Sequence, residues 1–202
     1  ARSSVARAVI VLTGGAGFIG SAVLEGLNRR GRRDIVVVDS FSRLGKWRNL
    51  LGKSFLATVH KAALATFLDS PRAGAIEAII HIGACSSTTE FDENYLEANN
   101  TRYTMTLARR AVARGARFIY ASSAATYGDG AEGYDDDLTQ LDRLRPLNPY
   151  GLSKHRFDLE ARAAGLFDRI VGLKFFNVYG PNEYHKDEMK SVICKAHRQI
   201  LS

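Results

Sequence analysis

The sequence predicts an α/β fold in which helices cover a doubly wound parallel sheet. Short apolar runs alternate with helical patterns along the whole chain, which is typical of this class. A run such as Ile35-Val36-Val37-Val38 has no polar face, as expected of a parallel strand buried on both sides. A glycine-rich turn at Thr13 to Gly20 directly follows the first such run and precedes a helical pattern.

We expect each element from its own pattern, in chain order. Apolar runs predict strands, and amphipathic spacing predicts helices. Pro71 ends the second predicted helix, because proline cannot continue a helix. The longest stretch without a pattern, 128–149, is expected to be a surface loop near the strand ends, where such folds bind ligands. The strands are expected at 8–12, 34–38, 76–82, 117–121 and 170–175, and the helices at 17–30, 61–70, 94–114, 150–164 and 189–201.

Composition narrows the class of protein. Of the 202 residues, 46% are hydrophobic and 24% charged, which excludes a disordered chain and allows one sizeable core. No apolar run approaches the roughly 20 residues of a membrane-spanning helix, and the run at 9–12 is too short for a signal peptide. The two cysteines, Cys85 and Cys194, are far apart and predict free thiols in a reducing cytoplasm.

The chain carries a formal net charge of +7, which fits nucleic acid, an acidic membrane surface or a phosphorylated small molecule. The densest basic cluster, 29–33, falls at a predicted helix end, where cations complement the helix dipole. Basic residues form no stripe interleaved with aromatic residues, and no zinc-finger spacing occurs. We therefore expect no nucleic-acid or membrane partner.

The glycine-rich turn predicts a dinucleotide site. Gly14, Gly17 and Gly20 allow a tight turn, a close approach of the backbone to a pyrophosphate and close packing of helix on strand. Asp39 ends the next strand 19 residues later, where an acid holds the ribose hydroxyls of adenosine. Asp39 alone favours NAD, but Arg43 and Lys46 could neutralise a 2′-phosphate, so NADP stays open. The alternative is a plain turn with a helix-capping aspartate.

A second motif, Tyr150-x-x-x-Lys154, opens a predicted helix. The spacing of four places both side chains on one face. A neighbouring ammonium is expected to lower the pKa of the phenol toward the range of a general acid or base. Upstream, the strand at 117–121 leads into Ser122-Ser123, and a serine there can hydrogen-bond the substrate oxygen that Tyr150 deprotonates.

Together these motifs resemble the extended, nucleotide-sugar-modifying branch of the short-chain dehydrogenases/reductases. The resemblance implies a Rossmann fold and reversible hydride transfer between a sugar carbinol carbon and nicotinamide, with Ser123 as the catalytic serine. It also implies a set of residues that contact the cofactor: Gly14, Gly17, Phe18, Ile19, Gly20, Asp39, Ser40, Lys46, Ile82, Gly83, Ala84, Cys85, Ser86, Asn99, Lys154, Val178 and Lys186.

One comparison within this branch separates two chemistries. Nucleotide-sugar dehydratases carry an Asp-Glu pair after the catalytic Ser or Thr, and here these positions are Ala124 and Ala125. Elimination of water therefore lacks its acid and base, and the sequence favours redox or epimerase chemistry.

Three segments, at 83–90, 120–128 and 176–186, look like those of the ADP-L-glycero-D-manno-heptose 6-epimerases. This resemblance implies inversion at C6″ of an ADP-heptose for the lipopolysaccharide core, by transient oxidation with bound NADP, with NAD as the alternative. It implies Tyr150 and Lys186 as the two bases and Lys154 as the residue that orients the nicotinamide ribose. Ser123, Asn177 and Glu188 are implied as substrate contacts, and a homo-oligomer such as a pentamer as the assembly.

The chain departs from that pattern in several ways. Asp187 stands where glycine is common, Ser40 where asparagine is usual, and the segment 53–61 lacks an expected aspartate. Members of the family are also longer, so we expect a cofactor domain at 1–180, the start of a substrate lobe at 181–202, and most of that lobe absent.

Two alternatives remain open, namely another nucleotide-sugar epimerase and a dinucleotide-binding fragment without activity. His81 and His185 have no partners at metal-ligand spacing, so no metal is expected, and His81 is expected to be structural.

Overall fold

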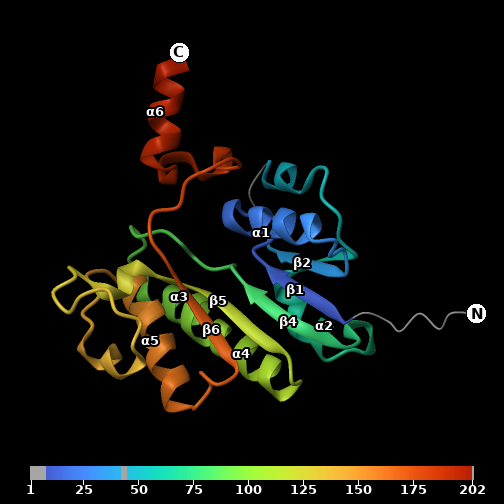
Figure 1. Cartoon of the computed structure of the whole chain (residues 1–202), viewed down its shortest axis with the longest axis horizontal. Helices are drawn as coiled ribbons and strands as arrows, with labels where there is room; N and C mark the ends of the chain where they lie inside the picture. Colours follow the sequence, from blue (N-terminus) through green and yellow to red (C-terminus); the bar gives the residue numbers. More distant parts are fainter. Residues whose placement is uncertain (1–7, 42–44, 202) are drawn as a thin grey trace, which may run out of the picture.

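The computed structural model describes residues 8–41 and 45–201, with the backbone alone at Tyr184, Asp187 and Glu188. Within these residues six strands form one sheet in the order β3-β2-β1-β4-β5-β6, and every neighbouring pair is parallel (Figure 1). This confirms the predicted doubly wound parallel fold. The strands are β1 (Val9–Thr13), β2 (Ile35–Asp39), β3 (Ala57–His60), β4 (Ile76–His81), β5 (Arg117–Ser123) and β6 (Ile170–Phe175).

Helices connect successive strands. One helix runs without a break through α3, a π-helical stretch at Glu97–Arg102, and α4. Short 3-10 turns lie at Lys46–Leu50, Lys61–Ala63, Pro71–Ala73, Ala124–Tyr127, Leu138–Arg143 and Tyr184–Met189. The α-helices are α1 (Phe18–Arg29), α2 (Leu64–Leu68), α3 (Glu93–Leu96), α4 (Tyr103–Ala113), α5 (Pro149–Ala163) and α6 (Val192–Leu201).

The expected elements are found within a few residues of their predicted bounds, with two differences of substance. The strand β3 was not predicted, because its four residues are mostly exposed and pair only with β2 at the sheet edge. The helix predicted at 61–70 shrinks to α2, since its first turn is 3-10.

Two apolar clusters hold the sheet. On one face, Val11, Ile79 and Phe118 pack against α2, α4 and α5. On the other, Leu12 and Val37 pack against α1. Because residues alternate between the faces of a strand, both faces of the central strands are buried.

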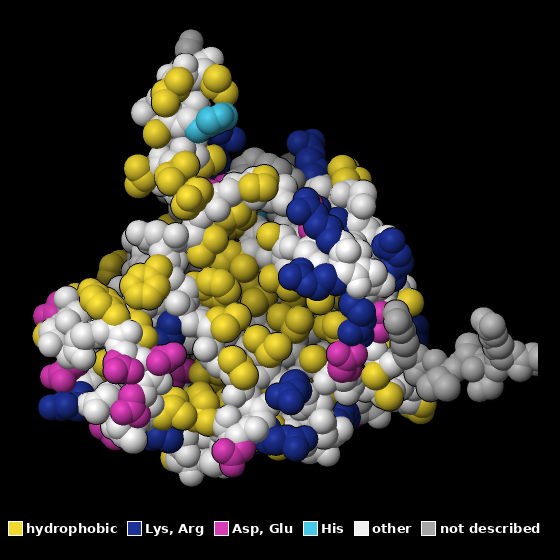
Figure 2. Space-filling view, in the orientation of Figure 1, with side chains coloured by type: hydrophobic (Ala, Val, Ile, Leu, Met, Phe, Trp, Pro, Cys, Tyr) yellow, Lys and Arg dark blue, Asp and Glu magenta, His cyan; other side chains and the backbone are white. Residues whose placement is uncertain are grey.

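The α1 face is covered less completely beyond the central strands. Val171 and Leu173 on β6 are 49% and 42% exposed, and apolar side chains gather on this face in Figure 2. The segment after β6 leaves the sheet, and α6 stands away from it (Figure 1), with none of its side chains buried. In the part of the chain that the structure describes, no helix has the length and hydrophobicity to cross a bilayer.

Parallel pairing brings the carboxyl ends of all these strands to one edge of the sheet. The loops after β1, β2, β4, β5 and β6 therefore meet there, although they are far apart in the sequence. The site described below lies at this edge.

Two glycines of α1 provide a matched test of the packing between helix and glycine turn. A Cβ on Gly20 would lie 2.1 Å from the carbonyl oxygen of Gly14, whereas one on Gly26 would meet only the Arg30 guanidinium, at 3.7 Å. We expect Gly20→Ala to lower the free energy of unfolding by roughly 1–3 kcal/mol through overpacking. Gly26→Ala should raise it by roughly 0.5–1 kcal/mol, because alanine favours the helix. Urea denaturation of both variants measures this, and equal effects would contradict the packing.

Candidate active site

The glycine turn has the geometry of a phosphate cradle. Gly14 adopts φ +68°, and a Cβ there would lie 2.6 Å from the backbone nitrogen of Gly83, in the turn after β4. The turn closes through a 2.9 Å hydrogen bond from the Gly17 N–H to the Gly14 carbonyl. No side chain caps α1 at Gly17, so the first backbone N–H groups of the helix and its positive dipole end are available to an anion.

Asp39 braces this turn from the end of β2. It is buried, and its Oδ2 accepts the Ala16 N–H at 3.1 Å. Its Oδ1 accepts the Ser40 N–H at 2.8 Å and pairs with Lys46 Nζ at 2.6 Å. The sequence predicted Asp39 and Lys46 as separate cofactor contacts and did not predict this ion pair. Arg43, the other cation considered for a 2′-phosphate, lies outside the described residues.

A pocket of about 380 Å³ opens beside the turn at the carboxyl edge of the sheet. Most of the residues predicted to contact the cofactor line it: Gly14, Gly17, Phe18, Ile19, Gly20, Asp39, Ser40, Lys46, Ile82, Gly83, Ala84, Cys85, Ser86, Asn99 and Lys186. Sequence reasoning missed other lining residues, among them Lys61, Tyr95, Tyr103, His185 and Met189. The glycine cradle, the uncapped helix and the pocket together fit a dinucleotide.

The predicted catalytic side chains lie next to this pocket. Ser123 ends β5, and Tyr150 is the second residue of α5. Asn148 caps that helix by accepting the Gly151 N–H at 2.7 Å. Tyr150 and Ser123 share a side-chain hydrogen bond, and the phenol also senses the thiol of Cys85, which lines the pocket. The structure thus brings Ser123 and Tyr150 together at the pocket edge.

The predicted lowering of the Tyr150 pKa by Lys154 is wrong, because the pKa is raised and Lys154 is not among the groups that shift it. Burial raises the pKa of Tyr150 above its ordinary value, while the hydrogen bond with Ser123 acts in the opposite direction. The Lys154 ammonium donates instead to the Ala121 carbonyl at 2.8 Å. Burial lowers the pKa of Lys154 itself to about 8, and nearby Asp158 opposes that shift.

An asparagine that the sequence reasoning passed over organises the neighbouring turn. Asn100 accepts the Cys85 N–H at 2.9 Å and donates to the Cys85 carbonyl at 3.0 Å and to Ser153 Oγ at 3.1 Å. The predicted residue, Asn99, lines the pocket and accepts a hydrogen bond from Lys61 at 2.7 Å. The adjacent asparagines at 99 and 100 indicated in the sequence that one of them contacts this turn. Which of the two points inward depends on the π-helical stretch in which both lie.

The histidine at the end of β4 is structural, as predicted. His81 is buried, and its ring nitrogens lie 2.6 Å from Thr13 Oγ1 and 3.0 Å from Thr104 Oγ1. Burial, together with the charges of Lys154 and Lys61, lowers its pKa to about 3. The ring is therefore neutral near pH 7. Among the described residues, no three His, Cys, Asp or Glu side chains gather where they could hold a metal ion.

The segment 180–191 carries Lys186 to the pocket. The Lys186 ammonium lies 5.0 Å from the centre of the Phe18 ring, at the start of α1. The buried Glu183 shapes this segment, because it accepts the N–H groups of Gly180, at 3.0 Å, and Ser191, at 2.6 Å. Burial raises the pKa of Glu183, but these hydrogen bonds outweigh it and hold the pKa below its ordinary value. Sequence reasoning missed Glu183.

Two further contacts tie the same segment to the N-terminal half of the chain. Asn182 donates to Ser21 Oγ on α1 at 3.1 Å. His185 lies 3.4 Å from the Asn49 amide nitrogen, which also donates to the Ala16 carbonyl at 2.9 Å. Lys186 is therefore held beside the glycine turn by contacts that span more than a hundred residues of sequence.

Five predicted residues whose side chains the structure describes do not line this pocket, namely Ser123, Tyr150 and Lys154, which lie beside it, and Asn177 and Val178. Asn177 and Val178 follow β6, where Asn177 is exposed and Val178 is half-buried, and neither lines the pocket. The side chain of Glu188 lies outside what the structure describes. Phe176, next to Asn177, instead packs against Tyr127 and Tyr134, with ring centres 6.2 and 5.8 Å away.

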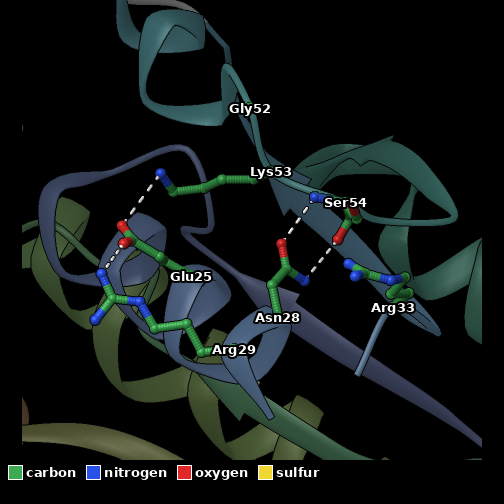
Figure 3. A pocket seen from close by; sticks show the side chains of 7 residues that line it. All are labelled: Glu25, Asn28, Arg29, Arg33, Gly52, Lys53 and Ser54. Carbon is green, nitrogen blue, oxygen red and sulfur yellow. Dashed lines mark hydrogen bonds and ion pairs between the residues drawn. The ribbon is translucent and has the colours of Figure 1, made fainter. Parts of the chain in front are cut away.

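A second hollow of about 380 Å³ lies at the far end of α1 (Figure 3). There Glu25 pairs with Arg29 at 2.6 Å and Lys53 at 3.5 Å, and Asn28 exchanges hydrogen bonds with the backbone of Ser54. Arg30 donates to the Gly26 carbonyl in the last turn of α1, at 3.2 Å. These contacts agree with the prediction that the basic cluster lies at a helix end. Those of Lys53 and Ser54 also attach the loop before β3 to α1.

Comparison with known proteins agrees with this geometry. The ADP-L-glycero-D-manno-heptose-6-epimerase of Nitratidesulfovibrio vulgaris Hildenborough is 54% identical over 194 residues, which are 94% of this chain and 59% of that protein. The crystal structure of the Helicobacter pylori protein of the same name superposes with a TM-score of 0.80 at 28% identity, over 94% of this chain and 61% of the other. The chain thus spans about 59% of the length of the curated relatives it matches.

A second solved structure bears on the cofactor. UDP-glucuronic acid 4-epimerase from Bacillus cereus, in complex with NAD, superposes with a TM-score of 0.72 at 26% identity, over 86% of this chain and 57% of that one. The pattern that defines the NAD dependent epimerase/dehydratase family matches residues 10–202. The chain belongs to the NAD dependent epimerase/dehydratase family, which implies a nicotinamide cofactor.

Proposed function

We propose that this site inverts C6″ of ADP-D-glycero-D-manno-heptose to give the L-glycero epimer, for the heptose of the lipopolysaccharide core. The observation that carries the proposal is that Lys186 lines the pocket, while Tyr150, beside Ser123, lies within electrostatic reach of Cys85 in the pocket wall. The names of the curated relatives support the substrate. The similarity to these relatives extends over about 59% of their length, which is the part that this chain shares with them.

We propose NADP as the cofactor. When bound, NADP would supply the reversible hydride transfer that the inversion needs. The N-terminus of α1 and the glycine turn would hold its pyrophosphate, and Asp39 lies where the adenosine ribose is expected. Lys46, within 2.6 Å of Asp39, supplies a positive charge next to that ribose. A cation at this position favours a 2′-phosphate and thus NADP over NAD.

The chemistry requires oxidation because the carbinol C–H at C6″ is not acidic. Tyr150, hydrogen-bonded to Ser123, takes the hydroxyl proton as the hydride leaves, and a ketone forms at C6″. After the ketone turns in the site, a proton must be supplied from a second position. Lys186 lines the pocket from a different segment and provides it. The family resemblance assigns the orientation of the nicotinamide ribose to Lys154, which is buried near Cys85 of the pocket wall. Ala124 and Ala125, in the turn after Ser123, offer no group for eliminating water.

The first test is turnover of ADP-D-glycero-D-manno-heptose by this chain beside its Tyr150→Phe variant, followed by NMR of the sugar. Loss of the phenol should lower the rate by about 10²–10⁴-fold, as for removal of a general acid–base group, and should leave cofactor binding intact. A chain that binds NADP without turnover would contradict the proposal and identify a dinucleotide-binding fragment. Turnover of UDP-hexoses alone would identify another sugar-nucleotide epimerase.

The second base is tested by comparing two lysines of one segment. Lys186 lines the pocket and Lys190 does not. We expect Lys186→Met to lower the epimerisation rate by about 10²–10⁴-fold, and Lys190→Met to change it less than twofold. If the two variants lose activity equally, the positive charge of the segment matters and Lys186 is not a base.

Cofactor choice is tested at Lys46. The substitution Lys46→Met removes the cation. It thereby deletes a charge-assisted contact to the 2′-phosphate and leaves Asp39 to repel that phosphate. We expect the Kd for NADP to rise about 10–100-fold, which corresponds to a charged hydrogen bond of ~1.5–3 kcal/mol. The Kd for NAD should change much less. Isothermal titration calorimetry measures both, and parallel losses would place Lys46 in a structural role alone.

A further inference from the structure

Asp158 lies on the face of α5 that carries two residues of the proposed chemistry. Tyr150, Lys154 and Asp158 follow one another at intervals of four, so their side chains stack along one side of the helix. The function proposed above gives roles to Tyr150 and Lys154 and none to Asp158. Asp158 is nevertheless only 2% exposed, and a carboxylate is seldom buried without a partner.

The contacts of Asp158 join α5 to the strand that ends in Ser123. Its Oδ1 accepts the Tyr120 hydroxyl at 2.6 Å, and its Oδ2 accepts the Ser122 hydroxyl at 3.0 Å. Both donors belong to β5. Two hydroxyl donors on one carboxyl group match an ionised carboxylate, which only accepts hydrogen bonds.

The charged and titratable groups around Asp158 come from β5, the turn after β5, α5 and β6. From β6, Lys174 Nζ lies 3.6 Å from Oδ2 and donates to Thr126 at 2.7 Å. From α5 itself, His155 lowers the pKa of Asp158, and Asp158 in turn raises the pKa of Lys154. From β5, Tyr120 lowers the pKa of Asp158 and has its own pKa raised by it. In the turn after β5, the charge of Asp158 contributes to raising the pKa of Tyr127. Burial raises the pKa of Asp158 above its ordinary value, and Tyr120, Lys174, Ser122 and His155 offset only part of that rise.

We propose that Asp158 is a positioning residue of the active site, whose buried carboxylate keeps Lys154 protonated and fixes the end of β5 beside Tyr150. This inference rests on the proposed function of the site. Lys154 is buried and donates to the Ala121 carbonyl, so its charge needs a compensating anion nearby. Asp158, one helical turn away, supplies that anion. A neutral Lys154 would lose most of its attraction for a ribose hydroxyl and for a tyrosinate.

A purely structural role predicts something different. If Asp158 only ties α5 to β5, then removing one of its hydrogen-bond donors should disturb the site as much as removing its charge. Tyr120→Phe keeps the ring and the carboxylate and deletes one hydrogen bond. Asp158→Asn keeps the size of the side chain and deletes the charge. The two variants therefore separate charge from attachment.

The pKa of Lys154 is the readout, measured by NMR titration of the chain with isotope-labelled lysine and assigned with Lys154→Met. In the unmodified chain burial already lowers this pKa to about 8. We expect Asp158→Asn to lower it by about one further unit, as for the loss of a nearby opposite charge, and Tyr120→Phe to leave it within about 0.3 unit. An unchanged pKa in Asp158→Asn, or an equal shift in Tyr120→Phe, would overturn the proposal.

Cofactor affinity provides the functional readout. Because a higher pH removes the proton of Lys154, the affinity for NADPH should begin to fall about one pH unit earlier in Asp158→Asn than in the unmodified chain. A loss of affinity that is equal at every pH would contradict the electrostatic role.

A measurement on the unmodified chain covers the case in which Asp158→Asn does not fold. Carboxyl-carbon NMR of Asp158 should show an ionised group throughout pH 6–9, and a protonated carboxyl at pH 7 would refute the proposal. None of these readouts requires epimerisation, so a failure of the proposed substrate remains distinguishable from a failure of this inference.

Discussion

The site depends on three backbone segments that approach one another with no side chain between them. The turn after β1, the turn after β4 and the first turn of α1 meet where a Cβ on Gly14 would strike Gly83, and one on Gly20 would strike the Gly14 carbonyl. This contact fixes the direction of α1 and turns its uncapped N-terminus toward the pocket. A bulkier residue at either position would separate the helix from the sheet and close the cradle.

Polar contacts then transmit the position of this turn to the rest of the site. Asp39 holds it through the Ala16 N–H, and Asn49 holds the Ala16 carbonyl. Through Asn49 and His185 the turn reaches the segment that carries Lys186. On the other side, Cys85 and Asn100 connect the pocket to α5. The proposed acid–base groups thus come from distant parts of the chain and are all connected to the glycine turn by these contacts.

Features that depend on a short segment could be predicted from the sequence, whereas features that depend on tertiary contacts could not. The parallel sheet, the glycine turn and the Tyr150–Lys154 pair could be predicted because each depends on spacing within a short segment. The strand β3 could not, since its exposed residues become a strand only by pairing with β2. Asn100 could not either, because the π-helical stretch decides which asparagine points inward. The raised pKa of Tyr150 follows from burial, which a motif does not encode.

We propose above that this site inverts a sugar carbon by oxidising and re-reducing it with one hydride that stays in the pocket. Substrate labelled with deuterium at C6″ tests it directly, with the label of both epimers followed by mass spectrometry and NMR. With such a hydride, the product keeps its deuterium at C6″ in ordinary water. Replacement of the label by solvent hydrogen during inversion would instead show deprotonation at that carbon and would rule out the hydride mechanism.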